Sequence, residues 1–294
     1  MPASSRVRLR AHAKINLDLR ILGVRPDGYH ELRTIFQTIA LHDVVTVESR
    51  RGAFELDGDA ALMPLDRTNL AWRAADLLWR AAGKRGSPSG ARIVIDKRIP
   101  SQAGLGGGSS DAATALQLAN ATLDAPRSSD ELHRIAAQIG ADVPFFLYGG
   151  AQLATGDGTE LTPVDLPSAY WVVLVMPDCD AKESTGKVYR AFDERAGADG
   201  FRQRADSLRL ALAATRTPRD LARLPANDLA SSSLARELIE VGAFRADVSG
   251  AGPTVFGLFE SATDADSASA SLQRAGRTLV TRPIDADDLP RVAR

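Results

Sequence analysis

The feature of this sequence that most restricts its fold is a strict alternation of apolar and polar residues near the N-terminus. Every odd position from Val7 to Ile21 is apolar, and every even position from Arg8 to Arg20 is polar or charged. Because side chains in a strand point alternately to opposite faces, this period of two predicts a β-strand. The run is long for one strand, so we expect it to bend or to continue as a hairpin beyond a turn at 25–28.

The later segments mix helical and strand patterns without a regular order. Helices are expected at 69–82, 109–123, 188–193, 201–214, 234–241 and 265–275. A capping box of Ser128 and Glu131 opens a further helix, which stops at Gly140. Strands are expected at 44–47, 92–95, 170–176, 254–259 and 278–280. This order predicts an α+β fold, and two prolines within 161–168 suggest a boundary between domains 1–164 and 165–294.

The composition is that of an ordinary globular protein without a strong charge bias. Of 294 residues, 44% are hydrophobic and 25% are charged, and the formal net charge is −1. This balance argues against a general nucleic-acid or membrane-surface binder. The opening MPASSRVRLRAHAK has no apolar signal core, and no apolar run approaches the roughly 20 residues of a membrane span. A single cysteine, Cys179, excludes an internal disulfide and favours a reducing, cytoplasmic location.

A glycine-rich loop in front of a predicted helix is the strongest functional signal. The stretch IPSQAGLGGGSSDAATAL, residues 99–116, places four glycines within five residues, followed by two serines and an alanine-rich run. Glycine lets a backbone turn tightly or approach a ligand closely. A helix N-terminus presents unpaired N–H groups at the positive end of its dipole. The loop therefore predicts a phosphate site in which the hydroxyls of Ser109 and Ser110 assist the backbone amides.

The spacing of the glycines bears on three other interpretations of this loop. A flexible helix entry without a ligand is possible, although three consecutive glycines cost roughly 1 kcal/mol each relative to alanine in regular structure. The order Gly104-Leu105-Gly106 does not continue into the dinucleotide fingerprint, and Asp124, near the distance of its acid, lies at a helix end. No lysine follows the glycines as in a P-loop. A nicotinamide dehydrogenase is therefore disfavoured.

Three stretches together resemble the GHMP kinases, a family named for galactokinase, homoserine kinase, mevalonate kinase and phosphomevalonate kinase. The loop Pro100–Ser110 resembles the phosphate-binding motif of the family. The stretch AKINLDLRILGVRPDGYHELRTIFQTI resembles an opening motif, and VSGAGPTVFGLF (248–259) resembles the third, C-terminal glycine motif. The tetrapeptide Asp27–His30 and GADVPFF (140–146) match one branch, whose acceptor carries a cytidine diphosphate group. The motifs follow the family's order over nearly the whole chain.

The resemblance implies a fold, a reaction and its partners. The fold would be the two-domain GHMP kinase fold, with a first domain similar to ribosomal protein S5 domain 2 and a ferredoxin-like second domain. The reaction would transfer the γ-phosphoryl group of ATP to the 2-hydroxyl of a cytidine-diphosphate-linked methylerythritol in the non-mevalonate isoprenoid pathway. Mg²⁺ would arrive mainly with ATP. The chain would act in the cytoplasm as a monomer or weak homodimer, on a small molecule, without nucleic acid or membrane.

Two residues are expected to carry the chemistry. By resemblance Asp142 is the catalytic base and Lys14 its partner; an ammonium within about 4–6 Å keeps a carboxylate ionised. Asn16, two residues along the strand, shares a face with Lys14 and would orient either group. The structural alternatives are that Asp142 is a helix N-cap before Pro144 and that Lys14 lies on the wet face of an edge strand.

The acceptor and nucleotide sites are carried over from the resemblance residue by residue. Tyr29 and Tyr189 would stack on the two faces of cytosine, His30 would read its edge, and Thr185 and Lys187 would reach the acceptor phosphates. The alternatives are a half-buried tyrosine, a solvent histidine and ordinary helix packing at Tyr189. The nucleotide-binding residues are expected to be Asn69, Lys97, Pro100, Ser101, Gln102, Ala103, Gly104, Leu105, Gly106, Gly107, Gly108, Ser109, Ser110 and Asp111.

Some details of these assignments depart from the family or add to it. At Ser101-Gln102-Ala103 we would expect smaller residues, and Gln102 adds bulk beside the loop. Asp111 is expected to cap or begin the loop helix, beside phosphates, where Mg²⁺ would screen its charge. The turn 249–254 would close over the acceptor. The histidines and Cys179 show no metal-like grouping, so no metal site is assigned.

Two rival functions remain open at this point. Another GHMP kinase, for homoserine or mevalonate, would need no aromatic residues around its small acceptor, so Tyr29, His30 and Tyr189 argue against it. A non-catalytic sensor could keep the fold and bind ATP and a sugar without turnover. The presence of both Lys14 and Asp142 argues against the sensor, and an activity measurement decides between them.

Overall fold

Two β-sheets organise the computed structural model. It describes residues 6–290 apart from 26–27, 29, 179–184 and 196, and residues 185, 202 and 204 by their backbone alone. The first sheet comprises β1 (Arg6–Val24), β2 (His30–Ala53), β3 (Glu55–Gly58), β4 (Ser89–Asp96), β5 (Ala151–Thr155) and β6 (Glu160–Pro163), in the order β3-β4-β2-β5-β6 with β1 also paired to β2. The second comprises β7 (Trp171–Met176), β8 (Arg245–Val248), β9 (Val255–Phe259) and β10 (Arg277–Thr281), in the order β10-β7-β9-β8.

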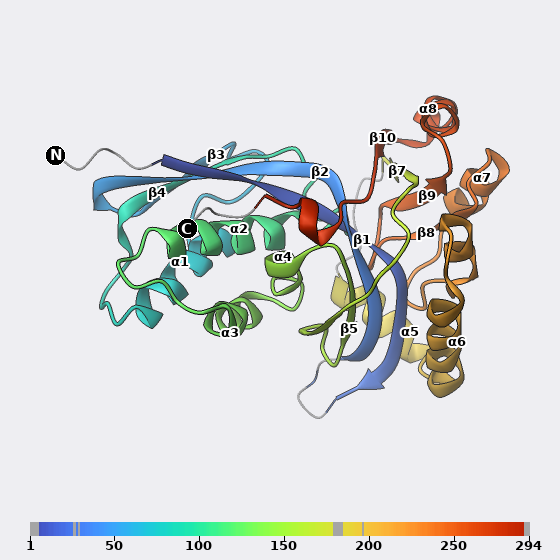
Figure 1. Ribbon diagram of the computed structural model, residues 1–294, viewed down its shortest axis with the longest axis horizontal. Coiled ribbons are helices and arrows are strands. Elements are labelled where there is room, and N and C mark those ends of the chain that lie inside the picture. The colour runs from blue at the N-terminus through green and yellow to red at the C-terminus, as the bar shows by residue number, and fades with distance from the viewer. Residues whose placement is uncertain (1–5, 26–27, 29, 179–184, 196, 291–294) are drawn as a thin grey trace.

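The predicted N-terminal strand is confirmed as β1, which continues through a hairpin into the antiparallel β2. The turn between them includes a hydrogen bond from Gly28 N to Arg25 O, as expected for 25–28. Three register shifts, at His12/Ala13, Asn16/Asp18 and Ile21/Gly23, interrupt the ladder. Bulges of this kind bend and twist a strand, and the two long strands curve together across the molecule (Figure 1).

The apolar residues of β1 over 7–17 belong to two hydrophobic clusters, one after the other along the strand. Val7, Leu9 and Ala11 belong to the cluster that includes residues of α1 (Leu70–Ala81) and α2 (Gly107–Ala121). Further along, Ala13, Ile15 and Leu17 pack with residues of the second sheet. The strand is therefore covered on both faces over 11–21, and its polar residues from His12 to Arg20 are buried as well. Buried polar groups need partners, and these partners define the site described below.

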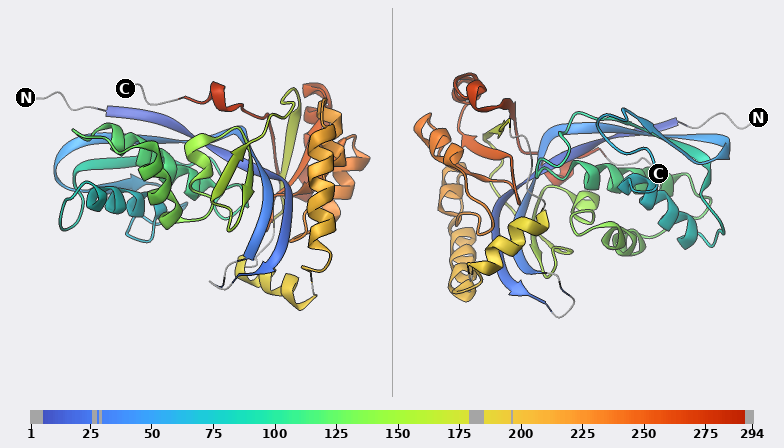
Figure 2. Two further views of the ribbon diagram at one scale, coloured as in Figure 1. Left: turned by 60° about the horizontal axis from the view of Figure 1, so that its bottom comes forward. Right: turned by 180° about the vertical axis from the view of Figure 1, so that it is seen from behind.

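Helices cover the outer faces of both sheets (Figures 1 and 2). Helix α2 packs on β1 and β2, and α1 and α3 (Ser129–Ile139) pack against α2. Helices α7 (Ser233–Glu240) and α8 (Ala262–Ser271) cover the second sheet, while α6 (Phe201–Ala214) contacts β1. The remaining elements are α4 (Phe145–Tyr148), α5 (Thr185–Glu194), and the 3₁₀ helices η1 (Pro218–Arg223), η2 (Gln273–Ala275) and η3 (Ala286–Asp288).

Most of the expected elements are confirmed, with shifted ends. The capping box of Ser128 and Glu131 is present, and α3 ends at its C-cap Gly140 as predicted. The segment 44–47 is part of the much longer β2, because its pairing with β1 and β4 extends the strand over polar residues that have no strand pattern of their own. The helix expected from 109 begins at Gly107, so two of the glycines lie in its first turn.

The chain passes from the first sheet to the second between Pro163 and Trp171. The two sheets nevertheless share one hydrophobic cluster, and the C-terminal segment returns to the first sheet through a bridge between Ile39 and Pro283. The division into domains 1–164 and 165–294 stays a prediction. Among the described residues, no helix has the length and hydropathy needed to cross a membrane.

Candidate active site

The glycine loop places the N-terminus of α2 at the centre of the molecule. Gly106 is its N-cap, with φ of 71°, a left-handed conformation that glycine adopts at little cost. An ideal Cβ at this position would lie 2.6 Å from the ring of Phe146 and 3.2 Å from Cγ of Lys14, so a side chain would also fill the space beside the lysine. The first N–H groups of a helix have no partner within the helix, and here they lie beside a buried cation. This arrangement suits an anion such as a phosphate.

A second glycine turn packs against this loop from the opposite end of the sequence. A Cβ at Gly104 would overlap the carbonyl oxygen of Ser249 and lie 3.0 Å from that of Gly252, so only glycine fits. The Ser249 hydroxyl donates to Gly104 O over 2.9 Å and accepts from Asn16 N over 3.3 Å. A Cβ at Gly250 would lie 3.3 Å from Asn16 Oδ1. The first and third glycine motifs thus meet at β1.

Lys14 and Asn16 lie on one face of β1, as the alternation predicts. Lys14 Nζ donates to Asn16 Oδ1 over 2.5 Å and lies 3.7 Å from Asp142 Oδ2. The side chain of Lys14 is buried, 4% exposed, so the wet edge strand considered for it is wrong. Burial lowers the pKa of the Lys14 ammonium, and the charge and hydrogen bonding of Asp142 partly oppose this shift. The Lys14 backbone N–H also donates to Leu105 O over 3.0 Å, which ties the strand to the loop.

Asp142 lies in the turn between α3 and α4. It is not a helix N-cap, because the N-cap of α4 is Pro144. Its side chain is 39% exposed while its partner Lys14 is buried, so the pair has one side open to solvent. Phe36 on β2 lies under the ammonium, with its ring centroid 5.1 Å from Lys14 Nζ. The structure therefore brings together a buried cation, a reachable carboxylate and a helix N-terminus.

An aromatic pair, His30 and Tyr189, lies near Asp142. The rings of His30 and Tyr189 are 4.6 Å apart at their centroids and tilted by 41°. Burial raises the pKa of Tyr189 to about 12, and the nearby charge of Asp142 adds to the rise. His30 Nε2 is 2.9 Å from Asp193 Oδ1, a partner that the sequence did not indicate. Tyr29, expected opposite Tyr189, lies outside the described residues.

The two residues expected at the acceptor phosphates are described incompletely. The side chain of Thr185, at the start of α5, lies outside the described part of the structure. Lys187, on the first turn of that helix, is exposed. Their roles stay predictions.

Several of the residues expected at the nucleotide have side-chain partners within the protein. Asn69 is the N-cap of α1; its Oδ1 accepts from Ala71 N over 2.9 Å and its Nδ2 donates to Pro64 O over 2.8 Å. Lys97 is buried between Asp43 Oδ2 at 2.5 Å and Asp111 Oδ2 at 2.7 Å. Burial lowers the pKa of Lys97, but the two carboxylates outweigh it and the net shift is upward. A Cβ at Gly107 would be 3.3 Å from Lys97 Nζ, so this ammonium lies beside the loop.

The expectation that Asp111 caps or begins the loop helix is wrong. The N-cap is Gly106, and Asp111 lies in the second turn of α2, buried under the loop with Lys97. Burial raises the pKa of Asp111 to about 7, against the charge of Lys97. Asp43, which completes this group, lies near the middle of β2 and outside the motifs described above. It accepts hydrogen bonds from Ile99 N and Arg98 N and so fixes the start of the loop.

The remaining residues of the loop differ in exposure, with some side chains in solvent and others packed against the protein. Ser101 and Gln102 are exposed, and Gln102 has φ of 55°, a left-handed value that explains why a smaller residue is expected there. Ala103 is buried. The Ser110 hydroxyl donates to His12 O over 2.6 Å, so its proton is committed to β1 rather than to a ligand. Ser109 remains the hydroxyl nearer the helix start.

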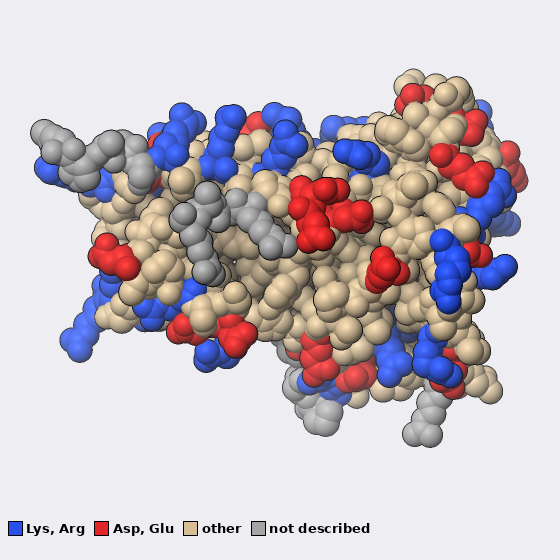
Figure 3. Space-filling view, in the orientation of Figure 1, with Lys and Arg blue, Asp and Glu red and all other residues tan. Residues whose placement is uncertain are grey.

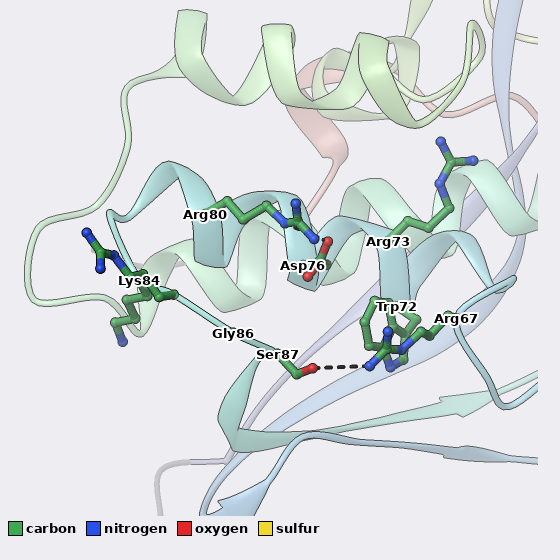
Figure 4. A pocket seen from close by; sticks show the side chains of 9 residues that line it. Arg67, Trp72, Arg73, Asp76, Arg80, Lys84, Gly86 and Ser87 are labelled. Carbon is green, nitrogen blue, oxygen red and sulfur yellow. Dashed lines mark hydrogen bonds and ion pairs between the residues drawn. The ribbon is translucent and has the colours of Figure 1, made fainter.

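A concave surface of about 680 Å³ lies elsewhere, on the outer side of α1 (Figure 4). It contains five cationic side chains, of which Arg67 lies 5.0 Å above the ring of Trp72. Arg80 forms an ion pair with Asp76 at 3.0 Å. None of the expected site residues lines it. Within the described residues, no group of three or more His, Cys, Asp and Glu side chains could hold a metal ion.

Comparison with known proteins gives the same family from sequence and from structure. Residues 69–150 match the family model for the GHMP kinases N terminal domain, and residues 225–278 match that for GHMP kinases C terminal. A 4-diphosphocytidyl-2-C-methyl-D-erythritol kinase of Gloeobacter violaceus is 40% identical over 90% of both chains. One of Cutibacterium acnes is 40% identical over 94% of this chain and 93% of its own.

Solved structures show the same relationship. A crystal structure of 4-(cytidine 5'-diphospho)-2C-methyl-D-erythritol kinase is 33% identical, with a TM-score of 0.73 over 94% of this chain and 99% of its own. A mevalonate kinase of Methanococcus jannaschii has the same TM-score at 13% identity, which shows a shared fold. The α+β fold is therefore the GHMP kinase fold, as the motifs indicated. With this fold, and with 40% identity along nearly its whole length, the chain belongs to the 4-diphosphocytidyl-2-C-methyl-D-erythritol kinase family.

Proposed function

We propose that this protein transfers the γ-phosphoryl group of ATP to the 2-hydroxyl of 4-diphosphocytidyl-2-C-methyl-D-erythritol, giving ADP and the 2-phosphate in the non-mevalonate isoprenoid pathway. The observation that carries the proposal is the pair of Lys14 and Asp142, 3.7 Å apart beside the N-terminus of α2. The relatives named above supply the acceptor. Both the geometry of the site and the relatives support phosphorylation of a small molecule.

The nucleotide fits the glycine loop. Gly104 and Gly106 leave backbone where side chains would otherwise stand, and the free N–H groups at the start of α2 would hold the phosphates. ATP supplies the phosphoryl group, and Mg²⁺ bound to it would spread the charge that develops on the phosphate oxygens. The Lys97 ammonium, held beside Gly107 by Asp43 and Asp111, would help to fix the loop in place.

The acceptor hydroxyl would lie between the loop and Asp142. Asp142 would take the hydroxyl proton, or hold it by a hydrogen bond until late in the transfer, because a loose transition state asks little basicity of the attacking oxygen. Lys14 would hold the carboxylate in place and add positive charge where the phosphoryl group passes. Tyr189 and His30 would recognise the cytosine by stacking and at its edge.

The balance of charge and the single cysteine support a cytoplasmic location for this reaction. Lys and Arg are interspersed with Asp and Glu over the face drawn in Figure 3, in keeping with the net charge of −1.

The test is turnover of ATP by the purified protein with Mg²⁺ and one acceptor at a time. 4-Diphosphocytidyl-2-C-methyl-D-erythritol, mevalonate and homoserine are offered in parallel, and ADP is measured. Turnover with the cytidylyl acceptor alone is the expected result. Turnover with another acceptor would keep the kinase and overturn the cytosine site. Binding of ATP without turnover of any acceptor would favour a sensor.

A further inference from the structure

A short chain of hydrogen bonds runs from β2 to the lysine of the site. The Thr34 hydroxyl donates to the backbone carbonyl of Asp18 over 2.6 Å. The same oxygen accepts from Asn16 Nδ2 over 2.7 Å, and Asn16 Oδ1 accepts from Lys14 Nζ over 2.5 Å. Thr34, Asn16 and Lys14 are all buried. These hydrogen bonds are therefore shielded from water, and the loss of any one of them would leave a buried polar group without a partner.

We propose that Thr34 is a positioning residue for the phosphoryl transfer: its hydroxyl holds the Asn16 amide with the carbonyl oxygen towards Lys14. This inference rests on the proposed function of the site, and Thr34 itself touches neither substrate.

The donors and acceptors available in this series of hydrogen bonds fix the direction of each bond. A hydroxyl has one proton and two acceptor lone pairs, and a backbone carbonyl can only accept. Because the Thr34 proton is committed to Asp18 O, its oxygen can only accept from Asn16. The amide must then present its NH₂ end to Thr34 and its oxygen to Lys14. With the amide reversed, N–H donors would face an ammonium that has only donors to offer.

The local backbone creates the place for this contact. The register of β1 and β2 shifts between Asn16 and Asp18, so two residues of β1 oppose one step of β2. Carbonyl groups beside such a bulge lose ladder partners. Here Asp18 O is satisfied by Thr34, and Leu17 O by Arg245 over 2.7 Å. At the bulge, the Asp18 carbonyl therefore bonds the Thr34 side chain, which in turn holds Asn16.

The consequence for Lys14 is electrostatic as well as geometric. Burial disfavours its charged form, and Asp142, partly exposed, is its charged partner at 3.7 Å. Asn16 Oδ1 is the closer contact, and an acceptor on the ammonium favours the charged form. A rotated Asn16 would leave Lys14 both less fixed and less readily protonated.

The experiment compares three changes at Thr34 with one on the same strand. Thr34→Val removes the hydroxyl and keeps the β-branched shape, Thr34→Ala repeats the deletion without a methyl facing Asp18 O, and Thr34→Ser keeps the hydroxyl. Thr38→Val is the matched control. Thr38 is as buried as Thr34, lies opposite Lys14 in the ladder, and its hydroxyl has no hydrogen-bond partner among the described residues.

We expect kcat to fall at least about tenfold in Thr34→Val and Thr34→Ala, while KM for ATP and acceptor changes less than about twofold. Thr34→Ser and Thr38→Val should keep kcat near that of the wild type. The pH profile of kcat separates positioning from simple loss of structure. Losing the Asn16 acceptor lowers the pKa of Lys14 further, so the basic limb of the profile should move to lower pH. Tyr189, with a pKa of about 12, does not titrate in that range.

The proposal is overturned if kcat is unchanged without the hydroxyl, if Thr38→Val shows an equal loss, or if Thr34→Ser shares the loss. A uniform fall in kcat with an unmoved basic limb would also reduce Thr34 to a structural residue. If Thr34→Val does not fold, Thr34→Ala and Thr34→Ser carry the comparison. Failure of the wild-type protein to phosphorylate the cytidylyl acceptor would be a failure of the proposed function instead, seen before any variant is made.

Discussion

At the scale of single residues, the site depends on charges held where water is scarce. Lys14 is buried and Asp142 is half-open, so the pair can present one carboxylate to an incoming hydroxyl without separating. The group at Lys97 differs, because the two carboxylates that pair with this lysine are both buried. The group at Lys97 fixes the start of the loop, and the pair of Lys14 and Asp142 is the one we propose for the reaction.

The first prediction concerns Asp142. In Asp142→Asn the group that we propose as proton acceptor is lost while the glycine loop is untouched. We expect kcat to fall by about 10²-fold or more, the range of general-base catalysis, with ATP affinity changed less than about twofold. Steady-state kinetics and calorimetric titration of ATP measure the two effects. The exposed Asp124→Asn is the control for loss of a negative charge. A variant at 142 with wild-type turnover would remove Asp142 from the mechanism.

Tyr189 allows a test of the acceptor site. Base stacking on an aromatic ring is worth about 1–3 kcal/mol, so Tyr189→Ala should raise the acceptor KM by roughly 5- to 150-fold. Tyr189→Phe keeps the ring and should stay close to the wild type. Tyr189 also packs beside Leu19, Ile21 and Phe192. If its role is packing alone, the alanine variant should lose thermal stability with an unchanged acceptor KM.

At the scale of elements, the candidate site lies where the glycine loop contacts the turn that follows β8. The glycine loop, β1 and the turn at 249–254 touch through Gly104, Asn16 and Ser249, which are far apart in sequence. Glycine is needed in the loop because neighbouring backbone approaches closely. The effect of this close approach on stability and turnover can be distinguished experimentally from the cost of placing a side chain on a left-handed backbone.

Gly104→Ala and Gly86→Ala form a matched pair for that purpose. Both glycines have positive φ, 79° and 73°, but a Cβ at Gly86 meets nothing within 4 Å. Each variant should lose about 1–2 kcal/mol from backbone strain. Gly104→Ala should lose more, because it must also push back Ser249 and Gly252, and a displacement of about 1 Å can cost 10²-fold in turnover. Urea unfolding and ATP kinetics measure both. Equal behaviour of the pair would show that the loop and turn are not in obligatory contact.

At the scale of the whole molecule, a buried arginine joins the two sheets. Arg245 on β8 donates to Leu17 O of β1 over 2.7 Å and to Pro225 O over 2.9 Å, and it pairs with Asp247 at 3.4 Å. Burial lowers the pKa of Arg245, an effect that the charges of Asp247 and Asp18 oppose. The contact between the sheets thus depends on a buried charge whose two terminal nitrogens both have carbonyl partners.

Arg245→Met should therefore destabilise the fold by about 3–5 kcal/mol, because it leaves Asp247 buried without its partner and several carbonyls without donors. Arg245→Lys keeps the charge but cannot reach the same set of carbonyls, so we expect a smaller but clear loss. Chemical denaturation measures both. A loss below about 1 kcal/mol in Arg245→Met would mean that apolar packing alone holds the sheets together.

The sequence alone predicted the strand at 7–21, the capped helix ending at Gly140, and the loop with its helix, since each depends on local periodicity or backbone freedom. It also predicted that Lys14 and Asn16 share a face. It did not predict that this polar face is buried, that Asp111 lies under the loop rather than at its cap, or that Thr34, Asp43 and Ser249 hold the site residues. Local pattern fixes which way a side chain points from its own strand or helix. What it meets there depends on how the twisted sheets and helices pack, and that was decided by contacts between residues far apart in the chain.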